Sequence, residues 1–356
     1  MKCGEVLIGI KAAVSMRSLI SFSVAGTASP VLLIGLVLGL CVGACQRTHA
    51  QVESLERFVY RQGHMGMEVR LVLYAPDRES SVQAAEAAFA EVAILDSLLS
   101  SYRSDSELMR VNRRAGEGPV AVGYHMFSIL DRGQVFARRS DGALDVTAGP
   151  LIQLWRTARR TQQLPDSTML QEAQRRVGWQ HLALEEEAQT VAFRRAGMEL
   201  NLGGLAKGYI LDQVREVLLE HGLRRVLVEA GGDLVAGAAP PGEPGWTVNI
   251  PHRAAGDSSR VIAVAHAAVA TSGDSVQYVE INGTRYSHVI NPKTGRGLTQ
   301  QPTTTVVAPT GITADALATT IGILGLKEGK KFAQSYYPGA TVYASTSDST
   351  AVLQRP

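Results

Sequence analysis

The spacing of apolar and polar residues predicts alternating strands and helices from about residue 65 onward. Residues 65–75, MGMEVRLVLYA, alternate between the two classes of side chain, which is typical of a half-buried strand. Apolar residues then recur at helical spacing over 79–99, 124–139 and 149–160. Ser104 and Glu107 have the spacing of a capping box, which predicts the start of a short helix between the first two of these.

The rest of the chain adds short strands and two more helices. A helix is expected to end near His221, and another over 312–324. Asn282 and Gly283 separate two alternating runs, which predicts a type I′ hairpin. Further strands are predicted in HLALEEE, QTVAFRR, RRVLVEA, WTVNI, VIAVAH, TTTVVA and GATVYAS. Hairpins mixed with helices favour an α+β (α/β) fold, with a largely antiparallel sheet and flanking helices, over a doubly wound parallel sheet.

Residues 1–45 differ from the remainder in composition. Three basic residues precede the apolar run VLLIGLVLGLCVGAC at 31–45, which is shorter than the 20 or so residues that span a bilayer. This pattern predicts an export signal. Its end resembles a bacterial lipobox, in which Cys45 is lipidated; cleavage after residue 50 and a soluble periplasmic product is the alternative. Either Met1 or Met16 can serve as the start.

The expected organisation is therefore a leader (1–45), a polar tether (46–63) and one domain (64–356). A lipid on Cys45 would hold that domain on the periplasmic side of a bacterial membrane without spanning it. All three cysteines lie in the leader, which excludes disulfides and thiolate metal sites from the domain. After residue 45 basic and acidic residues are equal in number, which argues against a nucleic-acid partner.

Two glycine-rich stretches follow predicted strands. In NLGGLAKGY, 201–209, paired glycines at the start of a helix let backbone N–H groups approach an anion, and Lys207 could reach a phosphate. EAGGDL, 229–234, also suggests a close backbone approach. A tight turn without a ligand is the alternative for each.

Three further places combine residue types that could carry chemistry. Asp145 lies in the apolar loop GALDVTAGP, where an Asx-turn or a helix cap is the alternative. His288 lies near the end of a predicted strand, as a general base or a structural histidine. Asp315 and Thr319 are four residues apart, so that their oxygens share one helix face. They could bind a hard cation such as Mg²⁺, or cap and pack the helix.

The order of these motifs resembles that of the ApbE family of flavin transferases. The matching stretches are Met65-Gly66, SSYRSDSEL, GALDVTAGPLIQLW, LNLGGLAKGYILD, VEAGGDL, ATSGD, RYSHVINPKTG and TADALATTIGILG. They extend from about residue 65 to the end, and a lipobox leader also fits the family. The resemblance implies a T-fold-like core.

The resemblance also implies an activity: Mg²⁺-dependent transfer of FMN from FAD to a threonine hydroxyl of an exported acceptor protein, with release of AMP. Asp315 and Thr319 would bind Mg²⁺ together with the backbone carbonyl of Gly204. His288 would lie nearest the incoming hydroxyl and, with Asp315, would be catalytic. The residues expected to line the FAD site are Met65, Tyr102, Ala143, Leu144, Asp145, Asn201, Lys207 and Val289.

Three residues depart from the family pattern. Met67 stands where the family often has threonine, and Asn201 and Asn291 stand where aspartate is common. None of the three is a proposed metal ligand. The family suggests a membrane redox-pump subunit as acceptor. Two alternatives stay open: a Mg²⁺-dependent FAD pyrophosphatase that gives FMN and AMP, and a flavin-binding lipoprotein without catalysis.

Overall fold

The computed structural model describes most of the chain after the leader. The described residues are 54–251, 260–273, 278–299, 302–345 and 350–355. The predicted leader, its Cys45 and most of the predicted tether lie outside these ranges. None of the helices in the described ranges combines the length and the apolar character that a bilayer crossing requires.

An eight-stranded sheet forms the framework, and every neighbouring pair in it is antiparallel. Its order is β1-β2-β6-β7-β10-β15-β16-β17. The strands are β1 (Glu56–His64), β2 (Met67–Ala75), β6 (Val226–Ala230), β7 (Asp233–Ala236), β10 (Ala267–Ser272), β15 (Thr303–Ala308), β16 (Thr341–Ser345) and β17 (Thr350–Gln354). The α+β fold with a largely antiparallel sheet is thereby confirmed.

Helices and small sheets occupy the connections. The helices are α2 (Arg78–Leu99), α3 (Glu107–Arg113), α4 (Tyr124–Arg139), α5 (Gly149–Thr161), α6 (Ser167–Arg175), the 3₁₀ turn η1 (Trp179–His181), α7 (Ala206–Glu220) and α8 (Gly311–Tyr336). The small sheets contain β3 (Val120–Ala121), β4 (Leu182–Glu185) and β5 (Thr190–Phe193); β8 (Trp246–Ile250) and β9 (Arg260–Val264); β11 (Tyr278–Ile281) and β12 (Thr284–Ser287); β13 (Ile290–Asn291) and β14 (Arg296–Gly297).

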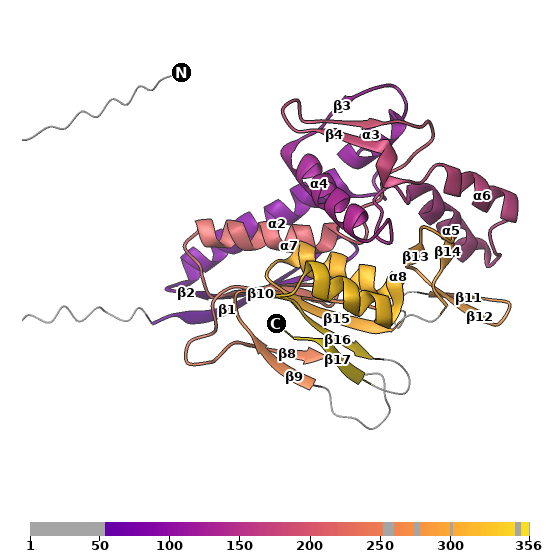
Figure 1. Ribbon diagram of the computed structural model, residues 1–356. Helices are drawn as coiled ribbons and strands as arrows, with labels where there is room; N and C mark the ends of the chain where they lie inside the picture. The colour runs from indigo at the N-terminus through magenta and orange to yellow at the C-terminus, as the bar shows by residue number, and fades with distance from the viewer. Residues whose placement is uncertain (1–53, 252–259, 274–277, 300–301, 346–349, 356) are drawn as a thin grey trace, which may run out of the picture. The chain divides into compact units, whose positions relative to one another are not determined.

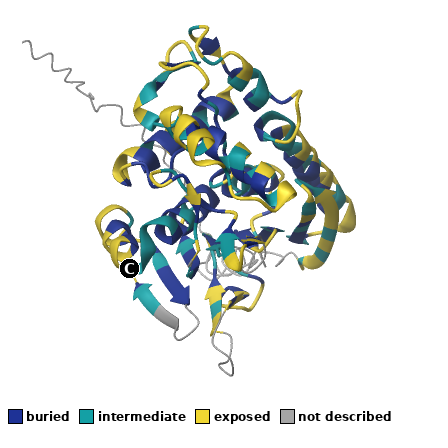
Figure 2. Ribbon diagram, turned by 90° about the vertical axis from the view of Figure 1, so that its right-hand side faces the viewer, coloured by how far each residue is buried: buried dark blue, intermediate teal, exposed yellow. Residues whose placement is uncertain are grey.

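Both faces of the large sheet are covered, because alternate residues of each strand pack in different clusters. Val69, Leu71 and Leu73 of β2 join the larger core with α2, α7 and α8, whereas Val72 joins the smaller one with β8 and β9. Figure 1 shows the three helices on one side of the sheet and the β8–β9 hairpin on the other. Buried residues gather in the interior and exposed ones on the outward sides of the peripheral helices (Figure 2).

Among the described residues, several hairpin turns have the left-handed backbone that a type I′ turn requires, and two of them bear on the predictions. The predicted turn at Asn282 and Gly283 has φ angles of 53° and 73° and joins β11 to β12. Met65 and Gly66, with φ of 53° and 71°, join β1 to β2 in the same way. The first is a confirmed prediction. The second places Met65 in a turn, because the strand predicted over 65–75 begins at residue 67 in the structure.

The structure corrects the predicted tether and the predicted helix cap. Residues 56–64 form the edge strand β1, so a tether over 46–63 is wrong for its last part. The missed signal is the pair Phe58 and Tyr60, which alternate and pack against the core. Ser106, and not Ser104, caps α3, because its Oγ accepts a hydrogen bond from the Met109 N–H.

Helix α8 is longer than predicted. The helix predicted over 312–324 is the first part of α8, and Gly325, with φ 77° and ψ 168°, separates it from a second part that ends at residue 336. A left-handed glycine is the usual end of a helix, and here the chain resumes helical geometry after it. Helix α6 and strand β17 were not expected from the pattern either.

Helices α7 and α8 cross with their backbones in contact. A Cβ atom at Gly208 would overlap the carbonyl group of Gly311, and one at Gly311 would overlap the carbonyl oxygen of Gly208. Asp212 of α7 secures the crossing, since its two carboxylate oxygens accept the N–H groups of Gly311 (2.6 Å) and Ile312 (2.9 Å). Burial raises the pKa of Asp212 to about 6. Only glycine fits at the crossing point on either helix.

We expect Gly208→Ala to lower the free energy of unfolding by about 1–3 kcal/mol, because the added methyl must separate the two helices. Helix propensity alone predicts the opposite sign, a gain of about 1 kcal/mol. Gly339→Ala is the control, since a Cβ there would have no heavy atom within 4 Å. Urea unfolding of the three proteins measures the difference. A Gly208→Ala variant as stable as the parent would show that the crossing tolerates a side chain.

Candidate functional site

The crossing of α7 and α8 brings the three predicted metal ligands together. Asp315 lies one turn into α8, and its Oδ2 accepts a hydrogen bond from the Gly208 N–H at 3.1 Å. Thr319 lies one turn further along the same helix. Gly204 precedes α7 and lies against Thr319, because a Cβ at Gly204 would be 3.3 Å from the Thr319 Cγ2. Two elements far apart in sequence thus place a carboxylate, a hydroxyl and a backbone carbonyl in one neighbourhood.

Lys207 extends from the first turn of α7 to a second carboxylate. Its Nζ lies 2.5 Å from the Oδ2 of Asp233, the first residue of β7. The lysine side chain is 23% exposed and the aspartate 3%, so the ion pair is largely removed from water. The EAGGDL motif assigns no role to Asp233, and the structure places its carboxylate beside Lys207.

The electrostatics of the site follow from one partly buried ammonium and two buried carboxylates. Burial raises the pKa of Asp315, and Lys207 opposes this. Burial likewise raises the pKa of Asp233, the charge of Asp315 adds to the increase, and Lys207 opposes both. Burial lowers the pKa of Lys207, but the two carboxylates outweigh it, so that the pKa lies above its ordinary value. With all three groups ionised the cluster carries one net negative charge.

These residues fit a small hard cation. The donors are all oxygens, which suit Mg²⁺, and the nearby backbone of Gly204 carries no Cβ that would separate it from Thr319. Only one oxygen of Asp315 accepts a hydrogen bond among the described residues, which leaves Oδ1 for a ligand. No group of three or more His, Cys, Asp and Glu side chains forms a metal cage in the described ranges. A site here would therefore depend on the hydroxyl, the carbonyl and outside ligands.

Residues 143–145 and 201, which are predicted to line the FAD site, lie next to this cluster. The Asn201 N–H donates to the Val146 carbonyl at 2.7 Å, and its side chain accepts from the Gly203 N–H at 3.0 Å. A Cβ at Gly204 would lie 3.0 Å from the Leu144 Cδ1. Asn201 and Leu144 thus border the glycine turn that carries Gly204.

Asp145 has a local structural task. Its Oδ1 accepts from the N–H (2.8 Å) and the hydroxyl (2.7 Å) of Thr147, and its Oδ2 accepts from the Trp179 N–H at 2.9 Å. Burial raises its pKa. This geometry agrees with the Asx-turn alternative for Asp145. Ala143 is buried beside it, and the contribution of the 143–145 segment to FAD binding stays a prediction.

Tyr102 lies on the loop between α2 and α3 and is 84% exposed. The guanidinium of Arg156, from α5, lies 4.2 Å from the centre of its ring. Arg156 also donates to the carbonyl (3.3 Å) and hydroxyl (2.7 Å) of Ser101. An exposed aromatic ring held on one face by a cation leaves its other face open, as a stacking surface requires.

His288 and Val289 lie on the segment that joins β12 to β13. His288 is exposed and Val289 is buried. Helix α5 anchors the β13–β14 arm that follows, since Trp155 donates its indole N–H to the Gly295 carbonyl at 2.8 Å. The neighbouring residue, Arg156, holds Tyr102. The same helix therefore supports the segments that carry Tyr102, His288 and Val289.

Met65 approaches the cluster through its hairpin. Two residues further on, the Met67 sulfur would lie 2.7 Å from a Cβ at Gly231, and the Lys207 Cδ would lie 3.8 Å from the same position. The β1–β2 turn thus lies on the Lys207 side of the cluster. A pocket of about 650 Å³ surrounds this turn and is lined by Met65 and Met67 among others.

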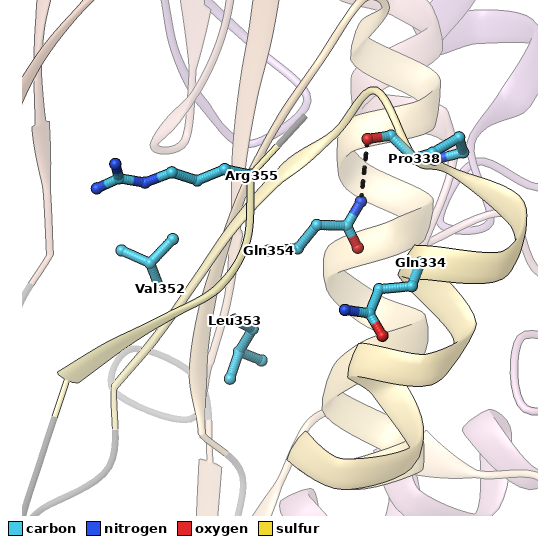
Figure 3. Close-up of a pocket in the computed structure, with 6 residues that line it drawn as sticks. All are labelled: Gln334, Pro338, Val352, Leu353, Gln354 and Arg355. Atoms are coloured by element: carbon cyan, nitrogen blue, oxygen red, sulfur yellow. Dashed lines mark hydrogen bonds between the residues drawn. The ribbon is translucent and has the colours of Figure 1, made fainter.

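Another pocket, of about 480 Å³, lies between the last part of α8 and β17 (Figure 3). Gln354 crosses it and donates to the carbonyls of Tyr337 (2.8 Å) and Pro338 (3.3 Å). Neither pocket is lined by Asp315 or Thr319. The candidate site is accordingly defined by the cluster of Gly204, Lys207, Asp233, Asp315 and Thr319, and not by these cavities.

Comparisons with known proteins agree on one family. The sequence model of the ApbE family matches residues 65–344. The chain is 32% identical over 312 residues to the FAD:protein FMN transferase of Treponema pallidum, covering 82% of this chain and 85% of that protein. It is 30% identical over 316 residues to the FAD:protein FMN transferase of Escherichia coli K12, covering 86% and 89%. The solved flavin transferase ApbE from Vibrio cholerae superposes with a TM-score of 0.74 at 28% identity, covering 82% of this chain and 93% of the other.

Proposed function

Since the chain belongs to the ApbE family, we propose that it transfers FMN from FAD to a protein acceptor and releases AMP. Curated relatives that match over more than four fifths of this chain carry the name FAD:protein FMN transferase. The observation that carries the proposal is the grouping of Gly204, Asp315 and Thr319 beside Lys207 at the start of α7. A diphosphate needs cationic and N–H groups of this kind.

Asp315, Thr319 and the carbonyl of Gly204 are the residues that would hold Mg²⁺. Bound there, the metal would neutralise charge on the diphosphate of FAD, which otherwise repels an attacking oxygen. Lys207 supplies a second positive charge close to the same place. Since Mg²⁺ usually keeps waters or substrate phosphates in its shell, three protein oxygens suffice.

The proposed transfer balances as one substitution at phosphorus. The threonine oxygen of the acceptor forms a bond to the phosphorus of the FMN half. The bond from that phosphorus to the bridging oxygen breaks, and AMP leaves with this oxygen. The proton of the threonine hydroxyl passes to His288, whose exposure and position on a chain segment between two short strands suit contact with a second protein. Such a base contributes about 10²–10⁴-fold to the rate.

The flavin would occupy the side of the cluster that faces Tyr102. The open face of this ring offers a stacking surface for an isoalloxazine or adenine ring. The remaining walls of the FAD site would come from the segments that carry Met65, Ala143–Asp145, Asn201 and Val289.

We further propose that the protein is exported and held at the membrane through a lipid on Cys45. The basic and apolar pattern of residues 1–45 supports this. An acceptor exposed on the same side of the membrane, such as a subunit of a membrane redox pump, would then lie within reach.

We expect the purified protein, given FAD, Mg²⁺ and an exported acceptor with a suitable threonine, to add the mass of FMN to that threonine. Intact-protein and peptide mass spectrometry measure the adduct, and chromatography measures AMP in equal amount. Free FMN and AMP without an adduct on several acceptors would support hydrolysis instead. Tight FAD binding without release of AMP would support a flavin-binding protein without catalysis.

Thr319→Val is expected to raise the Mg²⁺ concentration needed for half-maximal transfer by at least tenfold, because it removes an oxygen ligand without changing the side-chain volume. Thr320→Val is the matched control. Thr320 is the next residue of α8, is fully buried and donates its hydroxyl to the Ala316 carbonyl at 2.7 Å. Its replacement should lower stability and leave the Mg²⁺ requirement as it was. Equal effects of the two substitutions on the Mg²⁺ requirement would remove Thr319 from the metal site.

A further inference from the structure

We propose that Asp233 is a positioning residue that holds the Lys207 ammonium away from Asp315, and so keeps Asp315 available to a divalent cation. The inference rests on the proposed function, because it assigns the metal to Asp315. It concerns a residue for which the sequence motif gave no role.

Asp233 is fixed by the sheet before it meets Lys207. It follows Gly231 and Gly232, whose φ angles of 55° and 88° turn the chain from β6 into β7. Its Oδ1 accepts the N–H of Thr271, on the neighbouring strand β10, at 3.0 Å. The carboxylate is thus held by a backbone group of the large sheet, and its direction does not depend on the lysine.

The other oxygen of Asp233 has a single partner. Among the described residues, only the Lys207 ammonium lies against Oδ2, at 2.5 Å. Asp233 is 2% exposed, so water cannot replace this partner without opening the site. A buried carboxylate oxygen aimed at one lysine is the arrangement expected of a group that sets where the ammonium lies.

Lys207 has a second carboxylate within electrostatic reach. Asp315 attracts the same ammonium, and Lys207 directly precedes Gly208, whose N–H binds Asp315. A cation paired with Asp315 would occupy the oxygen that a metal needs. Removal of the charge on Asp233 should therefore shift Lys207 to Asp315, where it competes with the metal.

Asp233→Asn separates this role from a structural one. The amide oxygen can still accept the Thr271 N–H, and the volume is unchanged, but the NH₂ group cannot pair with an ammonium. The second substitution, Lys207→Met, removes the competing cation. If Asp233 acts through Lys207, the double variant recovers the metal affinity that Asp233→Asn loses.

The experiment measures Mn²⁺ binding to the full-length protein with FAD present and no acceptor, from the electron paramagnetic resonance signal of free Mn²⁺. Mn²⁺ shares the preference of Mg²⁺ for oxygen ligands. We expect Asp233→Asn to raise the Mn²⁺ dissociation constant at least tenfold, and Asp233→Asn/Lys207→Met to bind Mn²⁺ at least tenfold more tightly than Asp233→Asn. Glu229→Gln is the control with no expected change, since it removes a carboxylate of the same hairpin that pairs with Arg70.

Equal Mn²⁺ affinity in Asp233→Asn and the parent, or a double variant as weak as Asp233→Asn, would overturn the inference. So would a parent protein that binds no Mn²⁺. Failure of the proposed function gives a different result, namely normal Mn²⁺ binding without an FMN adduct. Thermal unfolding checks that each variant is folded. If Asp233→Asn does not fold, Asp233→Ser replaces it in both the single and the double variant, because serine keeps a hydroxyl acceptor. The expected changes in Mn²⁺ affinity are the same.

Discussion

The contact between the backbones of α7 and α8 is the constraint from which the candidate site follows. With glycine at Gly208 and Gly311, the two helices approach until the carbonyl of one residue faces the α-carbon of the other. Only at this separation does Asp315 reach the Gly208 N–H, and only then does the turn that carries Gly204 lie against Thr319. A methyl group at the crossing would separate the helices and so move the carboxylate and the hydroxyl away from the carbonyl.

The charges at the crossing argue for a functional cluster. Buried ion pairs contribute little net stability, since desolvation offsets their attraction. Here burial raises the pKa values of Asp233 and Asp315, which means that the folded protein disfavours their ionised forms. A divalent cation would offset this cost, and so would the proximity of Lys207. Polar groups that are costly to bury and converge on one place are typical of active sites.

The sequence predicted the larger elements because their signals are local. Helices α4 and α5 follow from apolar spacing, and the β11–β12 turn follows from Asn282 and Gly283. The edge strand β1 was missed although its partner β2 follows after a two-residue turn, because Phe58 and Tyr60 are a short alternating signal among polar residues. The second part of α8 was missed because the helix resumes after Gly325, where a left-handed glycine usually ends a helix. The choice of Ser106 over Ser104 as a cap likewise depends on how the loop packs.

The candidate site was predictable in part, because some of its signals are local as well. The spacing of Asp315 and Thr319 predicted that they share one helix face, and the order of the motifs indicated Gly204 and Lys207. The ion pair between Lys207 and Asp233 could not be predicted in this way, because it forms only where β7 starts beside α7. The local sequence pattern does not encode this arrangement. The oxygens of Asp145 bind Thr147 and Trp179, in agreement with the Asx-turn that its motif allowed as an alternative, and its contact with FAD stays a prediction.

The proposed function depends on a metal at the α7–α8 crossing that meets the diphosphate of FAD. Anomalous diffraction from crystals grown with Mn²⁺ and FAD would locate that metal. We expect one strong peak in ligation range of the Asp315 carboxylate, the Thr319 hydroxyl and the Gly204 carbonyl, with the two phosphates on its open side. FAD bound with its phosphates elsewhere, or a peak that none of these three residues contacts, would contradict it.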